Sequence, residues 1–134
     1  ACKIAVLSGV DLRIMIPGHP DHPFVYWANL SYAGEIVEYG AKVLLYQQGF
    51  LHAKTIVVDG EVASVGTMNI DARSFRLNFE VNAIIYDEQV ARQLQELFEE
   101  DSRECTELTR DRYRRRSIPV RIKEGISRLL SPIL

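Results

Sequence analysis

The residues best suited to chemistry begin with His52 and Lys54, which are two positions apart. Residues 50–58 are rich in β-branched and aromatic types and predict a strand. Side chains two apart on a strand point to the same face, so the imidazole and the ammonium would project together. A neutral imidazole is a nucleophile, and it also gives or takes a proton near neutral pH. The pair therefore suits attack on an anionic group.

A hairpin would add further polar groups to this pair. Asp59-Gly60 is typical of a tight hairpin turn, and residues 61–65 predict the return strand. The segment 66–69, Gly-Thr-Met-Asn, would then come back beside His52. Lysine and asparagine side chains donate hydrogen bonds to non-bridging phosphate oxygens. A lone histidine would indicate only a buried hairpin, but these residues together indicate a site that binds and attacks a phosphoryl group.

In these residues the chain resembles the phospholipase D superfamily. It matches the signature H-x-K-x4-D-x6-G-[ST]-x-N at every fixed position, with Thr67 where serine is commoner. Further segments resemble bacterial cardiolipin synthases, so that the resemblance covers nearly the whole chain. These segments are Pro17-Gly18 and residues 48–51, 74–82 and 130–134.

The resemblance implies a two-step phosphodiester exchange. One histidine attacks phosphorus to form a phosphohistidine, and a second histidine, from a second copy of the motif, protonates the leaving group. His52 would be either the nucleophile or the acid/base. No metal or other cofactor is implied, because the cationic side chains would carry the charge of the phosphoryl group.

The resemblance also assigns the site residues. The catalytic candidates are His52, Lys54, Asp59, Asn69 and Glu80, and Lys54, Thr67 and Asn69 would bind substrate. Glu80 would support His52 by accepting a hydrogen bond from its ring. Asp59 belongs to the motif, but its place in the Asp-Gly turn assigns it mainly to shaping that turn.

Glu80 lies in a second stretch with a strand-like pattern. Residues 77–86 predict a strand with Asn78, Glu80 and Asn82 on one face and apolar side chains on the other. A strand inside an α/β sheet is apolar on both faces, so a polar stripe indicates either a buried pocket or an edge strand that faces water.

The remaining chain predicts one α/β domain over residues 1–134, a mixed sheet with helices on both faces, as in a half-domain of the phospholipase D type. Strands over 10–16 and 41–46 and the helix between them predict a parallel, right-handed β-α-β unit. Asp87 would cap a helix over 88–108. Other helices are expected at 1–7 and 24–39, in a turn at 70–74, and from Ser117 onward after a basic connector at 110–116.

The loop His19-Pro20-Asp21-His22-Pro23 raises the idea of a metal site, but it offers no fourth ligand. Asp21 would instead cap the following helix. His19 and His22 are candidates for substrate contact only.

Charge is unevenly spread over the chain. Residues 1–109 carry 8 Lys/Arg and 16 Asp/Glu, a balance of −8, and residues 110–134 carry 8 and 2, a balance of +6, which sum to −2. The basic helical tail at 110–134 is either a surface for anionic lipid or nucleic acid, or simply a solvated helix face. The two cysteines have no metal or redox spacing, which favours a reducing compartment.

The expected function is phosphatidyl transfer between two phosphatidylglycerol molecules, which yields cardiolipin and glycerol. The alternatives are a nuclease or phosphodiesterase of the same superfamily and an inactive half that only binds lipid. The expected partners are phosphatidylglycerol and either the first motif half or a second copy of the domain, rather than nucleic acid. The absent start methionine and the opening inside a predicted helix favour the second half of a longer protein. The resemblance implies that this parent lies at a bacterial membrane, with this domain at the cytoplasmic face. No apolar run is long enough to span a bilayer, so the fragment itself is expected to be soluble.

Overall fold

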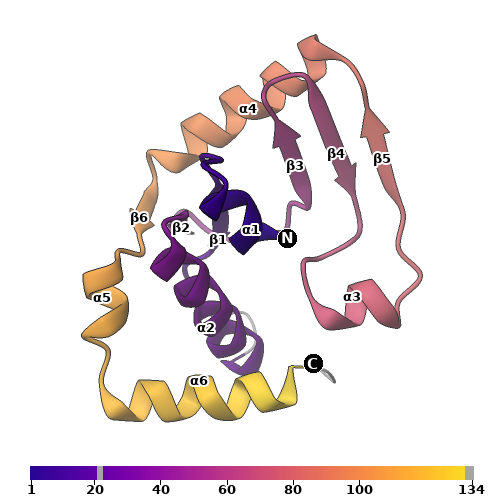
Figure 1. The fold of residues 1–134 in the computed structure, drawn as a ribbon. Coiled ribbons are helices and arrows are strands. Elements are labelled where there is room, and N and C mark those ends of the chain that lie inside the picture. Colours follow the sequence, from indigo (N-terminus) through magenta and orange to yellow (C-terminus); the bar gives the residue numbers. More distant parts are fainter. Residues whose placement is uncertain (21–22, 132–134) are drawn as a thin grey trace. The chain divides into compact units, whose positions relative to one another are not determined.

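The computed structural model describes residues 1–20 and 23–131, and these form two compact units (Figure 1). One unit comprises Ala1–Leu51 and Glu104–Leu134, and the other comprises His52–Arg103. Each unit combines a three-stranded sheet with helices, so the predicted α/β class is confirmed. The first sheet is mixed and the second is antiparallel.

The first unit is organised on the predicted β-α-β unit. β1 (Arg13–Pro17) pairs in parallel with β2 (Lys42–Tyr46), and α2 (Pro23–Tyr39) connects them. On β2, Val43 and Leu45 are 0% and 4% exposed, as expected for the central strand of a covered sheet. The predicted cap Asp21 and the candidate His22 lie outside the described residues.

A third strand, β6 (Cys105–Glu107), corrects the prediction of a helix over 88–108. The helix α4 (Glu88–Ser102) ends earlier, and β6 pairs antiparallel with β2. The amide of Leu108 donates a 2.9 Å hydrogen bond to the carbonyl of Val43, and Leu108 joins the core beside Val43 and Leu45. Strand pairing and burial of Leu108 therefore outweigh the local helical preference.

Three further helices belong to this unit. α1 (Cys2–Leu7) matches the helix predicted at 1–7. The predicted connector 110–116 contains a short helix, α5 (Arg110–Arg114), because the hydroxyl of Thr109 accepts a 3.2 Å hydrogen bond from the amide of Arg112 and caps it. α6 (Ile118–Leu130) begins after Ser117, as predicted. The basic tail thus holds two helices.

The second unit is a meander of β3 (Thr55–Val58), β4 (Val62–Gly66) and β5 (Asn82–Ile85). α4 packs against β3 and β4, and Ala63 and Ala91 are fully buried. The carboxylate of Asp87 caps α4 by accepting a 3.0 Å hydrogen bond from the amide of Val90, as predicted. The short helix α3 (Ala72–Arg76) joins β4 to β5.

Two strands of this unit are shorter than predicted. The strand expected at 50–58 begins at Thr55. The hydrogen bonds between β3 and β4 end where the amide of Gly66 donates to the carbonyl of Lys54 at 3.2 Å. The next amide, of Thr67, donates to the carbonyl of Val81 at 2.9 Å instead. The strand expected at 77–86 begins at Asn82, since the amides of Leu77 and Asn78 both bond to Arg73 and close α3. Among the described residues, no helix is long and apolar enough to cross a membrane.

Candidate active site

The hairpin turn sets the register of the motif. Asp59 and Gly60 have φ values of 53° and 67°, and the amide of Glu61 bonds to the carbonyl of Val58 at 3.0 Å. Two successive left-handed residues make the tight turn that Asp-Gly favours, so this prediction is confirmed. The resulting pairing places Thr55 opposite Val65 and brings the end of β4 back to the start of β3.

His52 and Lys54 lie in the segment just before β3, so the prediction that they share a strand face is wrong. Another contact joins them: the ammonium of Lys54 donates a 3.0 Å hydrogen bond to the backbone carbonyl of His52. His52 is exposed and Lys54 is half-buried. The lysine is therefore tied to the backbone that carries the imidazole, and two of its three N–H groups remain for other acceptors.

Glu80 is the most densely bonded member of the site. Its carboxylate accepts hydrogen bonds from the hydroxyl of Thr67 at 2.5 Å, from the side-chain NH₂ of Asn78 at 3.1 Å and from the hydroxyl of Ser74 at 3.2 Å. Glu80 precedes β5, and Asn78 lies further from it, so the predicted polar strand face does not form. Instead, the side chains of Thr67, Ser74 and Asn78 all donate hydrogen bonds to the Glu80 carboxylate.

Hydrogen bonds in both directions join the loop after β4 to the residues at the start of β5. The amide of Val81 donates a 3.0 Å hydrogen bond to the hydroxyl of Thr67, which itself donates to Glu80. The side-chain carbonyl of Asn82 accepts a bond from the amide of Met68 at 3.2 Å, and its NH₂ donates to Ser64 at 3.0 Å. These contacts fix the start of the loop after β4, and the exposed Asn69 lies further along that loop.

The electrostatics at Glu80 favour its charged form. The hydrogen bond from Thr67, followed by that from Asn78, holds the pKa of the Glu80 carboxyl below its ordinary value, and the Lys54 charge acts in the same direction. Glu80 is thus an anion near neutral pH, close enough to the Lys54 ammonium for the two charges to interact.

Ser74 and Asn78 are the site residues to which the sequence assigns no role. Ser74 is 5% exposed, and its amide also bonds to the carboxylate of Asp71 at 2.6 Å. A serine in a short helical turn has no pattern that marks it, whereas Asn78 is visible as part of the polar stripe. A carboxylate has room for about four hydrogen bonds, and Glu80 uses three here, so it keeps capacity for the predicted bond to His52.

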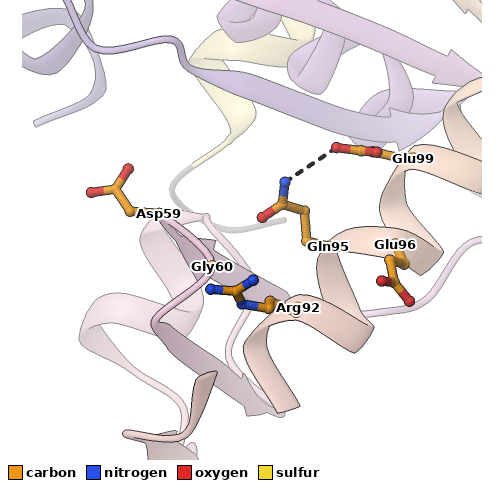
Figure 2. A pocket seen from close by; sticks show the side chains of 6 residues that line it. All are labelled: Asp59, Gly60, Arg92, Gln95, Glu96 and Glu99. Carbon is orange, nitrogen blue, oxygen red and sulfur yellow. Dashed lines mark hydrogen bonds between the residues drawn. The ribbon is translucent and has the colours of Figure 1, made fainter. Parts of the chain in front are cut away.

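Asp59 lies at the far end of the hairpin from these residues. The four residues of β3 lie between it and Lys54, so the two are five steps apart, about 16 Å along the strand. Figure 2 shows Asp59 and Gly60 beside a hollow whose other side is the α4 residues Arg92, Gln95, Glu96 and Glu99. Three carboxylates around one arginine do not favour a phosphate, so this hollow is not the motif site.

In the first unit, the candidate His19 is exposed and precedes α2. Among residues 1–20 and 23–131, no group of three or more His, Cys, Asp or Glu side chains could hold a metal ion.

Comparison with known proteins identifies the family. A family model described as "Cardiolipin synthase, PLD-like domain" matches residues 1–102. The chain belongs to the phospholipase D superfamily. The superfamily resemblance predicted from the His52–Asn69 motif is thereby confirmed.

Curated relatives within this superfamily match along the whole chain. They include "Cardiolipin synthase" of Oceanobacillus iheyensis, 62% identical over 134 residues, and "Cardiolipin synthase" of Listeria monocytogenes, 60% identical. "Major cardiolipin synthase ClsA" of Bacillus subtilis is also 60% identical. The match covers 100% of this chain and 28% of each of these relatives, so the chain spans less than a third of their length.

Proposed function

We propose that this chain supplies one half of the active site of a phosphatidyltransferase that makes cardiolipin from two phosphatidylglycerol molecules. The observation that supports the proposal is a chain of hydrogen bonds at one end of the β3–β4–β5 sheet, which joins His52 to Lys54, Lys54 to Gly66, and Thr67 of the following loop to Glu80. The relatives named above are cardiolipin synthases, and this supports the substrate class.

The reaction would run in two balanced steps. A histidine nitrogen attacks the phosphorus of the first phosphatidylglycerol, the bond to its glycerol head group breaks, and a second histidine gives its proton to the departing glycerol oxygen. In the second step, the hydroxyl of another phosphatidylglycerol loses its proton to that second histidine and attacks the same phosphorus. The bond from phosphorus to the first histidine then breaks, which frees the enzyme. His52 is one of the two histidines, in either role.

The neighbours of His52 have distinct tasks in this scheme. Lys54 and Asn69 donate to the phosphoryl oxygens, and Lys54 can do so while it holds the His52 carbonyl, because an ammonium has three N–H groups. Glu80 accepts a hydrogen bond from the ring N–H of His52 and so fixes its tautomer. Thr67 has one hydroxyl proton, which it gives to Glu80, so its main task is to position that carboxylate.

The second histidine must come from elsewhere, because the chain has one copy of the motif. The relatives are more than three times as long as the region they share with this chain, which leaves room for a second copy. We therefore favour a longer parent protein at a bacterial membrane as the source of the other half, and a second copy of this domain as the alternative.

A nuclease would use the same chemistry on DNA. The names of the relatives favour the lipid. An inactive half that only binds lipid is the remaining alternative.

A chimera would separate these possibilities. The region of the Bacillus subtilis relative that aligns with this chain, at 60% identity, would be replaced by the whole 134-residue chain. The purified chimera would then be incubated with phosphatidylglycerol vesicles and, separately, with plasmid DNA. We expect cardiolipin and glycerol from the vesicles and intact plasmid. Nicked plasmid without cardiolipin would favour the nuclease, and no reaction of a folded chimera would favour the inactive half.

A further inference from the structure

The C-terminal helix α6 packs on α2 and buries polar side chains. Glu124 and Ser127 of α6 are 3% and 1% exposed. Figure 1 shows α6 running alongside one end of α2, and the two helices are in contact. The guanidinium of Arg116 lies 2.7 Å from the buried Glu124 carboxylate and so compensates its charge. Arg128 bonds at 2.8 Å to Glu35 of α2. The contact between the two helices therefore includes charged and hydroxyl groups, and Val120 and Leu130 of α6 are half-buried beside them.

The apolar row of α6 faces outward. Ile118, Ile122, Ile126 and Leu129 are 71%, 56%, 50% and 83% exposed, and they recur at the spacing of one helix face. A surface helix ordinarily turns such a row toward the core, and α6 does the opposite. Four large apolar side chains along one helix form a surface of the kind that marks an interaction site.

Cations border this row on both sides. At 100° per residue, Arg121 falls along one edge of the row and Lys123 along the other, and both are exposed. Lys123 also lies over the ring of Trp27, with its nitrogen 5.4 Å from the ring centroid. The tail of residues 110–134 carries a net +6, although Arg114, Arg116 and Arg128 are engaged with acidic side chains. Arg121 and Lys123 are thus the cations placed to meet an anionic partner.

We propose that α6 lies in the head-group region of an anionic phospholipid bilayer, with the row from Ile118 to Leu129 inserted among the acyl chains. An apolar face with basic borders is the pattern of helices that lie in a membrane interface. The 13 residues of α6 are fewer than the roughly 20 that a spanning helix needs, so the helix lies along the surface. This docking is separate from the chemistry at His52 and would hold the domain against lipid whichever substrate the site uses.

Vesicle binding of the 134-residue chain tests the proposal. Wild-type protein and two variants, Ile122→Asn on α6 and Leu97→Asn on α4, would be sedimented with vesicles of phosphatidylcholine, with or without phosphatidylglycerol. Leu97 is the matched control, because it is also a large aliphatic residue on a helix and is also 56% exposed. We expect binding to the anionic vesicles, a partition coefficient lowered about tenfold by Ile122→Asn, and no change with Leu97→Asn.

Charge and self-association provide the remaining tests. Arg121→Gln should lower binding to anionic vesicles about fivefold, and salt should weaken the wild-type binding. His52→Ala should bind like the wild type, which keeps this test independent of catalysis. The proposal would be overturned if Ile122→Asn bound as well as the wild type, or if both asparagine variants lost binding equally. It would also be overturned if the wild type bound equally to neutral and anionic vesicles. A wild-type dimer that ignores vesicles and becomes a monomer in Ile122→Asn would overturn it too, and would assign the row to a second copy.

Discussion

The hydroxyl of Thr67 donates a 2.5 Å hydrogen bond to the carboxylate of Glu80, and the Thr67 hydroxyl oxygen also accepts a hydrogen bond from the amide of Val81. One side chain thus links the motif loop after β4 to the residue proposed to orient His52. The bond also makes the largest contribution to the lowered pKa of Glu80. This link gives the site a measurable property that does not depend on knowing the substrate.

Thr67→Val should raise the pKa of Glu80 toward its ordinary value, because the variant removes the strongest donor to the charged form. Since the folded pKa is depressed, the stabilisation from this bond is present above the unfolded pKa and is lost as pH falls through the folded pKa. NMR titration of the Glu80 carboxyl carbon measures the shift. Thr55→Val, a matched change on β3, should leave the titration where it is, and equal titrations in Thr67→Val and wild type would remove Thr67 from this role.

His52→Ala in the chimera should lower cardiolipin formation about a hundredfold or more, as expected when an acid/base group or nucleophile is lost. His52 is exposed, so the melting temperature should stay unchanged. The rate of cardiolipin formation and a thermal scan measure the two effects. Retention of more than about a tenth of the activity would be incompatible with the role given to His52.

Asp59→Asn should keep most of the activity and lower stability only slightly, because Asn-Gly also favours two successive left-handed residues. Asp59→Val places a β-branched residue at a φ of 53° and should cost about 1–2 kcal/mol of unfolding free energy. Chemical denaturation and the chimera assay provide the measurements. If Asp59→Asn were as inactive as His52→Ala, with an unchanged melting temperature, the turn role would be wrong.

Two glycines within helices should respond oppositely to alanine. A Cβ on Gly34 of α2 would collide with the ring of Tyr113 from α5, so Gly34→Ala should destabilise the protein by about 1–3 kcal/mol. A Cβ on Gly125 of α6 would meet no described atom within 4 Å, so Gly125→Ala should stabilise it by about 0.5–1 kcal/mol through helix propensity. Urea unfolding measures both, and a stabilising Gly34→Ala would contradict the packing of Tyr113 on α2.

Local signals in the sequence predicted the elements that depend on local chemistry. Asp59-Gly60 indicates the hairpin because few residue pairs can both adopt the left-handed conformation that the tight turn requires. Asp87 indicates the start of α4 because its carboxylate can accept a hydrogen bond from the amide three residues further on. The parallel pairing of β1 with β2 follows from the helix that connects them.

The sequence predictions are wrong where contacts between residues far apart in the sequence determine the local structure. β6 exists because Leu108 reaches the core beside Val43, and no residue near it in sequence indicates this. The segment carrying His52 and Lys54 leaves the sheet because Thr67 pairs with Val81, which lies 14 positions away. The motif identifies the chemical groups of the site, whereas the hydrogen bonds from Ser74 and Asn78 to Glu80 depend on how α3 and the loop fold back.

Cardiolipin formation by the 134-residue chain alone is the most direct test of the half-site. Two histidines must act on opposite sides of one phosphorus, and this chain carries one motif histidine, so the purified chain should release no glycerol and form no cardiolipin from phosphatidylglycerol vesicles. The chimera with the Bacillus subtilis relative should form both under the same conditions. Robust cardiolipin formation by the chain alone would contradict a longer parent protein as the source of the other half and would indicate that two copies of His52 meet in a homodimer.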